Sequence, residues 1–387
     1  MKAAKRNKSI FLFRKYARTV AIAMLVGGIE SLGMAQGATS LTWSPDVGTG
    51  NWDFTAANWT SGTGSTDYTD GSLVTFSGST GASITVTPGA GVSPGSMTIT
   101  GSGNWSFGGS PIYGATGITD SSSGTVTLNE SHNSYTGTTA VDAGTMMVEG
   151  LISGTSSVNV GTGITPATLT VGGTLSTPGA LLVGAKATLS GNGIVNAASV
   201  TVRNGATLAP TAFDGAGLTL NNGPVTLSTG STLQFSLANS NAAFSGAAAL
   251  ADYSKLTLGS GATMTLGGSN IELSLTEPVN QGDLFTVIMS GSTVAGLFAN
   301  TTDRVGASTY AFISNGTDYE INYAYSGGPT GSNVSEAAFA ADTSGTDVAV
   351  LVGAEAQAVP EPNTWVTLLA GLVFLFALQR RFRSRRT

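Results

Sequence analysis

His132 is the only histidine in the chain, and Glu130 lies two residues before it, so general acid–base chemistry could start only here. Both residues fall in an Asn-Glu-Ser-His-Asn turn, where a histidine is usually solvated at a loop tip. The chain has no cysteine, and it lacks the HExxH and GxSxG motifs of zinc and serine hydrolases. We therefore assign no catalytic, cofactor-binding or metal-binding residue from the sequence.

Carboxylates and cations are scattered along the chain. A polysaccharide lyase or glycosidase needs carboxylates, or carboxylates with Lys or Arg, gathered on one face. Asp142, Glu149 and Asp214 are acidic candidates, but they fall in separate segments. Lys186 and Arg203 lie 17 residues apart, about one repeat, and could stack as a lyase would require. The sequence does not favour an enzyme.

Four aspartates lie close together near the N-terminus, and their oxygens would suit Ca²⁺. No EF-hand loop or Gly-Gly-x-Gly-x-Asp repeat accompanies them, so we interpret them as turn-forming residues. They are Asp46, Asp53, Asp67 and Asp70.

Short strands are the elements that must position all these side chains. Between Thr39 and Gly328, apolar residues alternate with Thr or Ser over short runs separated by Gly and Asn, and no amphipathic helix of ordinary length appears. Alternation with a period of two is typical of β-strands. The chain is therefore predicted to be all-β.

The strand pattern repeats about every twenty residues. Leu169, Leu189 and Leu208 recur 20 and 19 residues apart, with looser returns at Leu233 and Met264. A second series steps by 19 and 18 residues through Val183, Val202 and Leu220. Two interleaved series with one period predict a parallel β-solenoid with at least two strands per coil. A β-sandwich, whose strands also recur regularly, is the alternative.

Asparagines near the strand ends suit corners that need positive φ. They are Asn192, Asn196, Asn204, Asn221 and Asn222.

The segment Gly124–Val148 resembles the autotransporter-associated β-strand repeat. Its elements are a Gly-Thr-x-Thr-Leu strand, an Asn-x-Tyr-Thr-Gly turn, a Thr-Thr-x-Val strand and an Ala-Gly-Thr-x-x-Val close; here they occupy Gly124–Leu128, Asn133–Gly137, Thr138–Val141 and Ala143–Val148. The resemblance implies a right-handed parallel β-helix like the stems of autotransporter passengers. No β-barrel translocator follows in the sequence, so self-transport is unsupported.

The N-terminus has the composition of a secretory signal. Seven basic residues precede a short apolar stretch at Val20–Ile29, and Gly33-Met34-Ala35 fits a small-x-small cleavage site after Ala35. An uncleaved signal anchor is the alternative. Residues 1–35 are expected to direct the chain to Sec-type export machinery.

The C-terminus combines a Pro-Glu-Pro element, an apolar run at Trp365–Leu378 and an arginine cluster. This arrangement resembles a PEP-CTERM sorting signal, which implies processing by an exosortase-like membrane enzyme. An ordinary stop-transfer anchor is the alternative, and either places the preceding chain outside the cytoplasmic membrane. The residues of the signal are Val359, Pro360, Glu361, Pro362, Arg380, Arg381, Arg383, Arg385 and Arg386.

The exported part is strongly acidic. Of the 16 basic residues of the chain, seven lie in the leader and five in the tail, which leaves four basic against 20 acidic residues. The absence of a basic patch makes nucleic acid an improbable partner.

Aromatic residues gather towards both ends of the body. Trp43, Trp52, Trp59 and Phe76 are expected to cover the first coil rather than bind sugar, and Asp283–Tyr325 resembles a C-terminal β cap. The expected plan is therefore a solenoid with N- and C-terminal caps and a C-terminal hydrophobic helix. Its segments are 1–35 signal peptide, 36–123 Trp-rich β cap module, 124–270 solenoid repeats, 271–325 C-terminal β cap, 326–358 linker and 359–387 sorting signal with a transmembrane segment.

Together these features predict an exported structural or adhesin-like protein of the cell surface, envelope or extracellular matrix, at least transiently anchored in the cytoplasmic membrane. Exopolysaccharide or another surface polymer is its expected partner. A secreted carbohydrate-active β-helix enzyme or a lectin is the main alternative, and a spacer without a ligand is the third.

Overall fold

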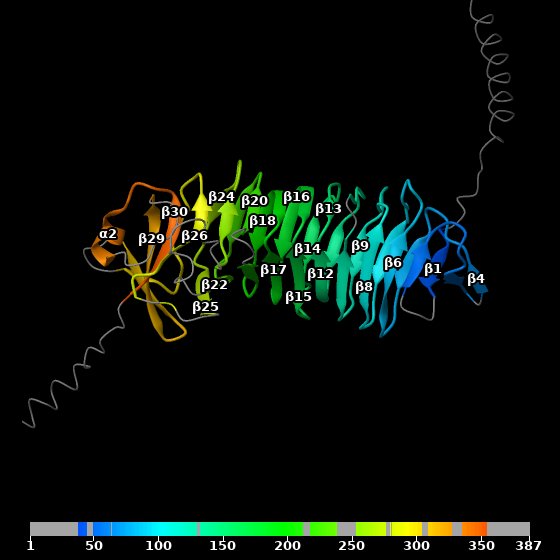
Figure 1. The fold of residues 1–387 in the computed structure, drawn as a ribbon, viewed down its shortest axis with the longest axis horizontal. Coiled ribbons are helices and arrows are strands. Elements are labelled where there is room, and N and C mark those ends of the chain that lie inside the picture. The colour runs from blue at the N-terminus through cyan, green and yellow to red at the C-terminus, as the bar shows by residue number, and fades with distance from the viewer. Residues whose placement is uncertain are drawn as a thin grey trace, which may run out of the picture. The chain divides into compact units, whose positions relative to one another are not determined.

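The computed structural model describes residues 38–44, 49–62, 64–129, 132–211, 217–237, 253–275, 279, 281–303, 309–326 and 335–353. Met1–Thr39 separates from Ser40–Thr387 as a compact unit, and the description below concerns the second unit. Its described residues are almost entirely strands, and the strands stack as successive coils (Figure 1). The chain is an all-β solenoid, as the alternating pattern predicts.

One wall of the solenoid is a ten-stranded sheet, here called sheet B, in which every neighbouring pair is parallel. Its strands are β2 (Thr49–Trp52), β6 (Gly81–Val86), β8 (Asn104–Gly109), β10 (Thr125–Leu128), β12 (Gly144–Val148), β15 (Ala167–Val171), β17 (Ala187–Gly191), β19 (Thr207–Pro210), β22 (Thr232–Leu237) and β25 (Asn270–Leu275).

The remaining strands form a twenty-stranded sheet, here called sheet A, which contains two parallel ladders. The first ladder contains β5 (Leu73–Phe76), β7 (Ser96–Ile99), β9 (Ile118–Asp120), β11 (Thr139–Val141), β14 (Val158–Val160), the second halves of β16 (Thr174–Val183) and β18 (Ile194–Val202), β21 (Pro224–Leu227) and β24 (Thr263–Thr265). The second contains β13 (Leu151–Ile152), the first halves of β16 and β18, β20 (Leu218–Asn221), β23 (Leu256–Leu258) and β26 (Leu284–Ser290). A central coil therefore passes through three ladders, because β16 and β18 turn a corner where their register shifts between Thr177 and Ala180.

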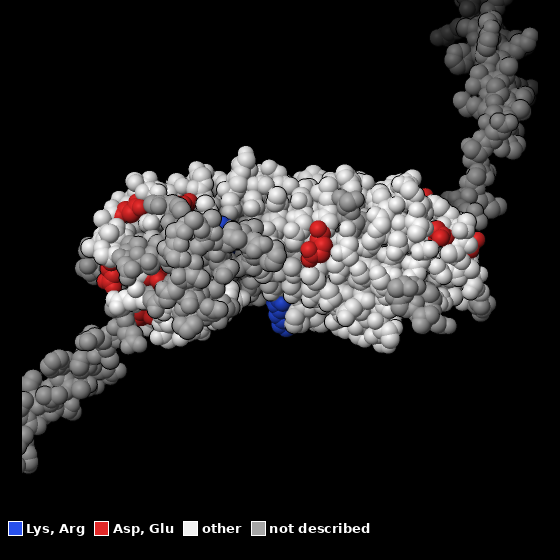
Figure 2. Space-filling view, in the orientation of Figure 1, with Lys and Arg blue, Asp and Glu red and all other residues white. Residues whose placement is uncertain are grey.

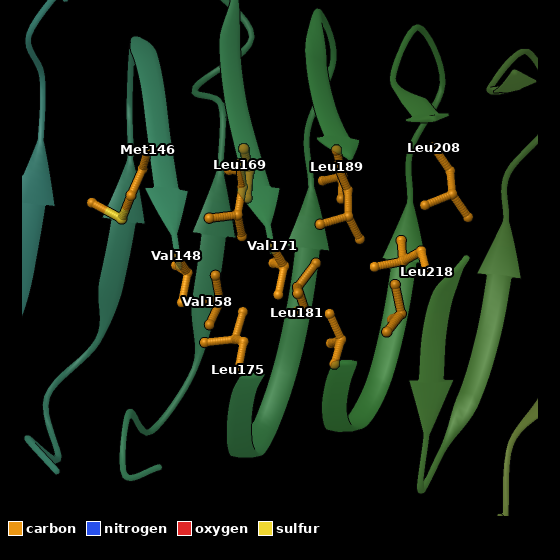
Figure 3. Close-up of a cluster of buried hydrophobic side chains, with 14 of the residues drawn as sticks. Met146, Val148, Val158, Leu169, Val171, Leu175, Leu181, Leu189, Leu208 and Leu218 are labelled. Atoms are coloured by element: carbon orange, nitrogen blue, oxygen red, sulfur yellow. The ribbon is translucent and has the colours of Figure 1, made fainter. Parts of the chain in front are cut away.

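Inward side chains from all three ladders form continuous apolar columns (Figure 3). Leu169, Leu189, Leu208 and Leu233 are in register from β15 to β22, and all four are fully buried. Each inward residue packs on the equivalent residue of the next coil, which removes apolar surface from water along the whole column.

The later members of the two sequence series were assigned to the wrong partners. Leu220 pairs with Val195, whereas the partner of Val202 is Leu227. Met264 pairs with Val225 in sheet A and does not continue the leucine column of sheet B. The coils lengthen after Pro210, so that a fixed spacing of about twenty residues counts onto a different ladder.

Parallel pairing begins well before residue 124. Sheet B runs from β2 through β6 and β8 into β10, and the first ladder of sheet A runs from β5 through β7 and β9 into β11. The segment 36–123, expected as a separate β module, therefore contributes strands to the same ladders as the repeats.

The N-terminal strands also include an antiparallel hairpin. β1 (Ser40–Trp43) pairs parallel with β5 and antiparallel with β3 (Trp59–Ser61), and β3 pairs with β4 (Gly64–Thr66). Beneath these strands lie the side chains that we call the aromatic cluster, all buried. Its members are Trp43, Trp52, Trp59, Tyr68 and Phe76.

The C-terminal strands are antiparallel. β26 pairs with β30 (Asp347–Val352), β30 with β29 (Thr317–Tyr325), β29 with β28 (Tyr310–Ser314), and β28 with β27 (Thr302–Asp303). The range 326–358, expected as a linker, thus contains the helix α2 (Glu336–Ala341) and the buried strand β30. The short apolar run DVAVLV provides that strand, and the Ser335 hydroxyl accepts a hydrogen bond from the Ala338 amide at the start of α2.

Side chains occupy the outer edge of β25, the last strand of sheet B. The Asn300 side-chain oxygen accepts from the Ile271 amide (3.0 Å), and its side-chain nitrogen donates to the Ile271 carbonyl (2.7 Å). The Ser314 hydroxyl bonds to the amide and the carbonyl of Leu273, both at 3.0 Å. These side chains make the hydrogen bonds that a further parallel strand would otherwise make.

The predicted asparagine corners are only partly correct. Among the five asparagines expected there, only Asn222 has a positive φ, at 78°. Asn196 and Asn221 lie within β18 and β20 instead. Next to Asn192 and Asn204, the glycines Gly191 and Gly205 take the positive φ, because without a Cβ they do so at no steric cost.

Candidate functional site

The residues assigned to export and sorting lie outside the described part of the chain. This holds for Ala35, for Val359–Pro362, for the apolar run Trp365–Leu378 and for the five arginines that follow it. Within the residues that the structure does describe, no helix is both long and apolar enough to cross a membrane. The assignment of both termini therefore continues to depend on the sequence.

His132 lies exposed at the start of the Asn133 turn, as expected for a loop-tip histidine. Its Nε2 atom is 3.2 Å from the Ser153 hydroxyl of the next coil. Glu130 lies outside the described residues, so the proposed pairing of the two cannot be placed. The only printed side-chain partner of the imidazole is this hydroxyl, which offers no orientation by a carboxylate.

The structure does not stack Lys186 on Arg203. Arg203 follows Val202, which pairs with Val183, so it lies level with Gly184; the Lys186 amide instead donates to the Gly205 carbonyl (2.8 Å). The two cations are thus offset along their coils. The Lys186 ammonium donates to the carbonyl of Ile164 (3.2 Å).

The acidic candidates also stay apart. Asp142 accepts a hydrogen bond from the Ser121 hydroxyl (3.3 Å), Glu149 is exposed just beyond the end of β12, and Asp214 lies outside the described residues. In the described ranges, no three His, Asp or Glu side chains come together as metal ligands.

Two of the N-terminal aspartates organise turns. The Asp53 carboxylate accepts from the amides of Thr55 (2.8 Å) and Ala56 (2.6 Å). The Asp70 carboxylate accepts from the Tyr68 hydroxyl (2.9 Å) and from the Ser93 amide (2.8 Å) of the next coil. Asp46 lies outside the described residues. Their oxygens are used by backbone amides in the way that Asx turns require.

The tryptophans considered for sugar stacking are buried. Trp43 is 5% exposed, and Trp52 and Trp59 are fully buried. Their rings pack on one another and on Phe76 with centroid separations of 5.0–5.6 Å. A sugar stacks on an exposed aromatic face, which these three rings do not present.

The Asn-x-Tyr-Thr-Gly turn has a structural role inside the coil. The Asn133 side chain is buried, and its oxygen accepts from the Ile112 amide of the preceding coil (2.9 Å). The Tyr135 hydroxyl bonds to Thr139 (2.8 Å), whose hydroxyl bonds to Thr155 of the following coil (2.9 Å). These polar side chains satisfy buried groups where consecutive coils meet.

Asp120 is a buried carboxyl that the sequence analysis missed. It is fully buried in the inward column of sheet A, between Ile99 and Val141 of the neighbouring coils. Its Oδ1 atom accepts from the amide (2.9 Å) and the hydroxyl (2.7 Å) of Ser122, while Oδ2 has no partner. Burial raises the pKa of Asp120 to about 6. Alternation from the inward Ile118 would have identified residue 120 as inward.

On the outer face of sheet A, polar side chains bond to one another across coils. The Asn196 side-chain nitrogen donates to the Ser176 hydroxyl (2.9 Å), and the Asn221 nitrogen donates to the Asn196 oxygen (2.9 Å). Each amide sits in register with the next, so the ladder stabilises the pairing of β16, β18 and β20.

The outer face of sheet B carries a different array, which we call the threonine rank. One threonine from each of six consecutive strands occupies the same register, and each is partly exposed. The members are Thr125, Thr145, Thr168, Thr188, Thr207 and Thr232.

Comparison with known proteins gave no match to a family model, to a curated protein or to a solved structure.

Proposed function

We propose that this protein is an exported structural or adhesin-like component of the cell surface or extracellular matrix, sorted by an exosortase-type enzyme. The observation that carries the proposal is the order of the sequence: a basic, apolar leader, a β body, and a Pro-Glu-Pro tail with an apolar run and five arginines. Export through Sec-type machinery and handover to a membrane transpeptidase-like enzyme account for both ends.

A solenoid body is well suited to a mechanical role. Successive coils repeat the same register over ten strands of sheet B, and each coil contacts only its neighbours, so the body presents the same chemistry at regular intervals. Weak contacts repeated along such a surface can add to firm attachment to a polymer without any deep pocket. We propose that the partner is an exopolysaccharide or another surface polymer.

The chemistry of the described surface favours a neutral partner. Figure 2 shows Asp and Glu (red) as separated patches and very few Lys and Arg (blue) on one face. With four basic and 20 acidic residues in the exported part, direct pairing with a polyanion is unfavourable. The absence of a cationic patch also argues against nucleic acid.

We further propose the finer features that the resemblance implies: a right-handed coil, caps at both ends and a hydrophobic C-terminal helix that holds the chain in the cytoplasmic membrane. The aromatic cluster and the antiparallel strands β26–β30 are the segments that would serve as caps, since each supplies buried apolar side chains next to a terminal coil.

The alternative is a carbohydrate-active enzyme or a lectin. One observation favours a lectin: the Phe54 ring is 42% exposed and stacks on Tyr68 with a centroid separation of 5.7 Å, so one aromatic face is held towards solvent. For an enzyme, the described carboxylates would have to converge, and Asp142 and Glu149 instead project from different ladders. We propose no catalytic role.

The test is the identity of the mature termini. Cells expressing the full chain are fractionated into cytoplasmic membrane, envelope and medium, and the protein in each fraction is characterised by intact and peptide mass spectrometry. We expect a chain that begins near Gln36, ends close to Pro360 and lies outside the cytoplasmic membrane. A variant with Pro360→Ala and Pro362→Ala should keep its tail and stay in that membrane, whereas Pro329→Ala should behave like the wild type.

An intact Thr387 in the cytoplasmic membrane of wild-type cells that carry the sorting enzyme would contradict the sorting proposal. The tail would then be a plain anchor, and the body would act at the membrane surface.

A further inference from the structure

The hydroxyls of the threonine rank are not used by the protein. Among the described residues, none of the six Oγ1 atoms has a protein hydrogen-bond partner. Elsewhere on the outer faces, neighbouring polar side chains do bond to each other, as in the Ser176–Asn196–Asn221 ladder and the Thr170–Ser190 pair (2.9 Å). The rank therefore presents six hydroxyls and six methyl groups to the surroundings in one line.

The rank has a fixed spacing and no charge. Strands of a sheet lie about 4.8 Å apart, so successive threonine side chains repeat at that distance. A second row, two residues along each strand, lies about 6.7 Å from the first. It is less regular than the rank, and the only charged neighbour of the two rows, Glu149, lies past the end of β12. The second row consists of Thr127, Met147, Thr170, Ser190, Ala209 and Gln234.

A repeat of this size is found in crystalline water. With hydrogen bonds of about 2.75 Å and tetrahedral angles, two water oxygens bonded to the same third oxygen lie about 4.5 Å apart. A line of hydroxyls at about 4.8 Å can replace a line of such oxygens, and the threonine methyl groups lie between them. The β-branched side chain has few χ1 rotamers, so the hydroxyl positions are held before any contact forms.

Two other occupants fit the surface less well. The face spans about 24 Å by 10 Å, or about 250 Å², which is well below the roughly 800 Å² per partner of a stable dimer. A polysaccharide would be expected to stack on an aromatic ring, and neither row contains one.

We propose that the threonine rank binds the surface of ice crystals, an activity separate from the surface role proposed above. Each hydroxyl contributes little, but the six positions engage together because sheet B fixes them in one register.

The experiment measures partition of the full chain into ice. A pure ice hemisphere is grown slowly from a dilute solution of the protein, and the protein concentration in the ice is compared with that in the remaining liquid. We expect several-fold enrichment over a non-binding reference protein of similar size and charge. Exclusion from the ice to the same degree as the reference overturns the proposal.

The specificity of the site is tested by paired variants. Thr168→Tyr with Thr188→Tyr should lower the partition to the reference value. The control is Thr201→Tyr with Thr226→Tyr, an in-register pair on the outer face of sheet A, which should leave the partition unchanged. Equal loss in both pairs would overturn the assignment to the rank. If the first pair fails to fold by circular dichroism, Thr168→Lys with Thr188→Lys replaces it, with Thr201→Lys and Thr226→Lys as control.

Sedimentation of the same proteins separates this proposal from self-association. A concentration-dependent dimer that Thr168→Tyr with Thr188→Tyr abolishes, without enrichment in ice, would assign the face to a second copy of the chain and overturn the proposal.

Discussion

The aromatic cluster and the central coils bury their inward residues in different ways. In the centre, a leucine or valine packs on a residue of similar size in the next coil, as in the column Leu169, Leu189 and Leu208. At the N-terminal strands there is no such repeat, and Trp43, Trp52 and Trp59 pack at steep ring angles instead. A repeated coil needs only one well-chosen inward residue, whereas a terminal coil has no neighbour on one side and must fill the space with large side chains.

The largest effect that tests this comparison is expected at Trp59. Its ring contacts Trp43, Trp52 and Phe76, and it is fully buried. Trp59→Ala should lower the free energy of unfolding by about 3–5 kcal/mol. Urea denaturation followed by circular dichroism measures the loss.

Trp59→Phe is the matched control. The buried indole N–H of Trp59 has no partner in the structure, so removing it breaks no hydrogen bond, and a loss of about 1–2 kcal/mol is expected from the smaller ring. Equal losses for the two variants would contradict a role based on ring packing.

The second prediction concerns the central column. Leu189→Ala should cost about 2–4 kcal/mol, because it leaves a cavity between Leu169 and Leu208. Thr188→Ala, on the outward side of the same strand, should cost less than about 1 kcal/mol. Hydrogen exchange should show faster opening of β15, β17 and β19 for Leu189→Ala, whereas Trp59→Ala should affect β1 to β8. Loss of protection over the whole body in both cases would mean that the coils do not act as nearest-neighbour units.

The third prediction concerns Asp120, where a carboxyl interrupts an otherwise apolar column. Burial raises its pKa to about 6 in the folded protein, against about 3.9 in an unfolded chain. The folded state therefore binds the proton more tightly, and the stability that this supplies is complete below about pH 4 and is lost as the pH rises through about 6. Asp120→Asn should remove this dependence and raise the stability at pH 7 by about 2–3 kcal/mol.

Thermal unfolding between pH 4 and pH 7 checks this prediction for both proteins. The control is Asp142→Asn, whose carboxyl is partly exposed in the next coil, and it should leave most of the pH dependence in place. A wild-type stability that does not change over this range would contradict the raised pKa.

The smallest effect is expected at the amide ladder of sheet A. Asn196→Ala removes the bonds to Ser176 and Asn221 and should cost about 1 kcal/mol. Thr201→Ala, in the same strand but without a ladder bond, should be nearly neutral. A larger loss for Thr201→Ala would show that the outward face is stabilised by something other than this ladder.

Sequence reasoning identified the central coils because their signal is local and repeated. Leu169, Leu189 and Leu208 could be aligned by counting residues, and the structure confirms their register. The method failed where coil length changes, as at Leu220, because strand pairing depends on three-dimensional register and not on spacing. It also misjudged Asn196 and Asn221, whose amides pair across strands instead of forming corners.

The candidate sites were less accessible to the sequence. Asp120 could have been found from alternation in its strand, but the unpartnered oxygen follows only from its packing. The threonine rank needs the register of six strands, which a composition rich in threonine does not reveal. The signals at both termini, by contrast, are readable only from the sequence, since they lie outside the described residues.

The occupied edge of β25 has a consequence for how this protein can change over evolutionary time. Because Asn300 and Ser314 terminate sheet B with side chains, the stop does not depend on how many coils precede it. A gene duplication or deletion of one in-register coil would leave both ends of the ladder as they are. Length can therefore vary between descendants while the terminal strands stay unchanged, so that relatives should differ in the number of coils before they differ in their ends.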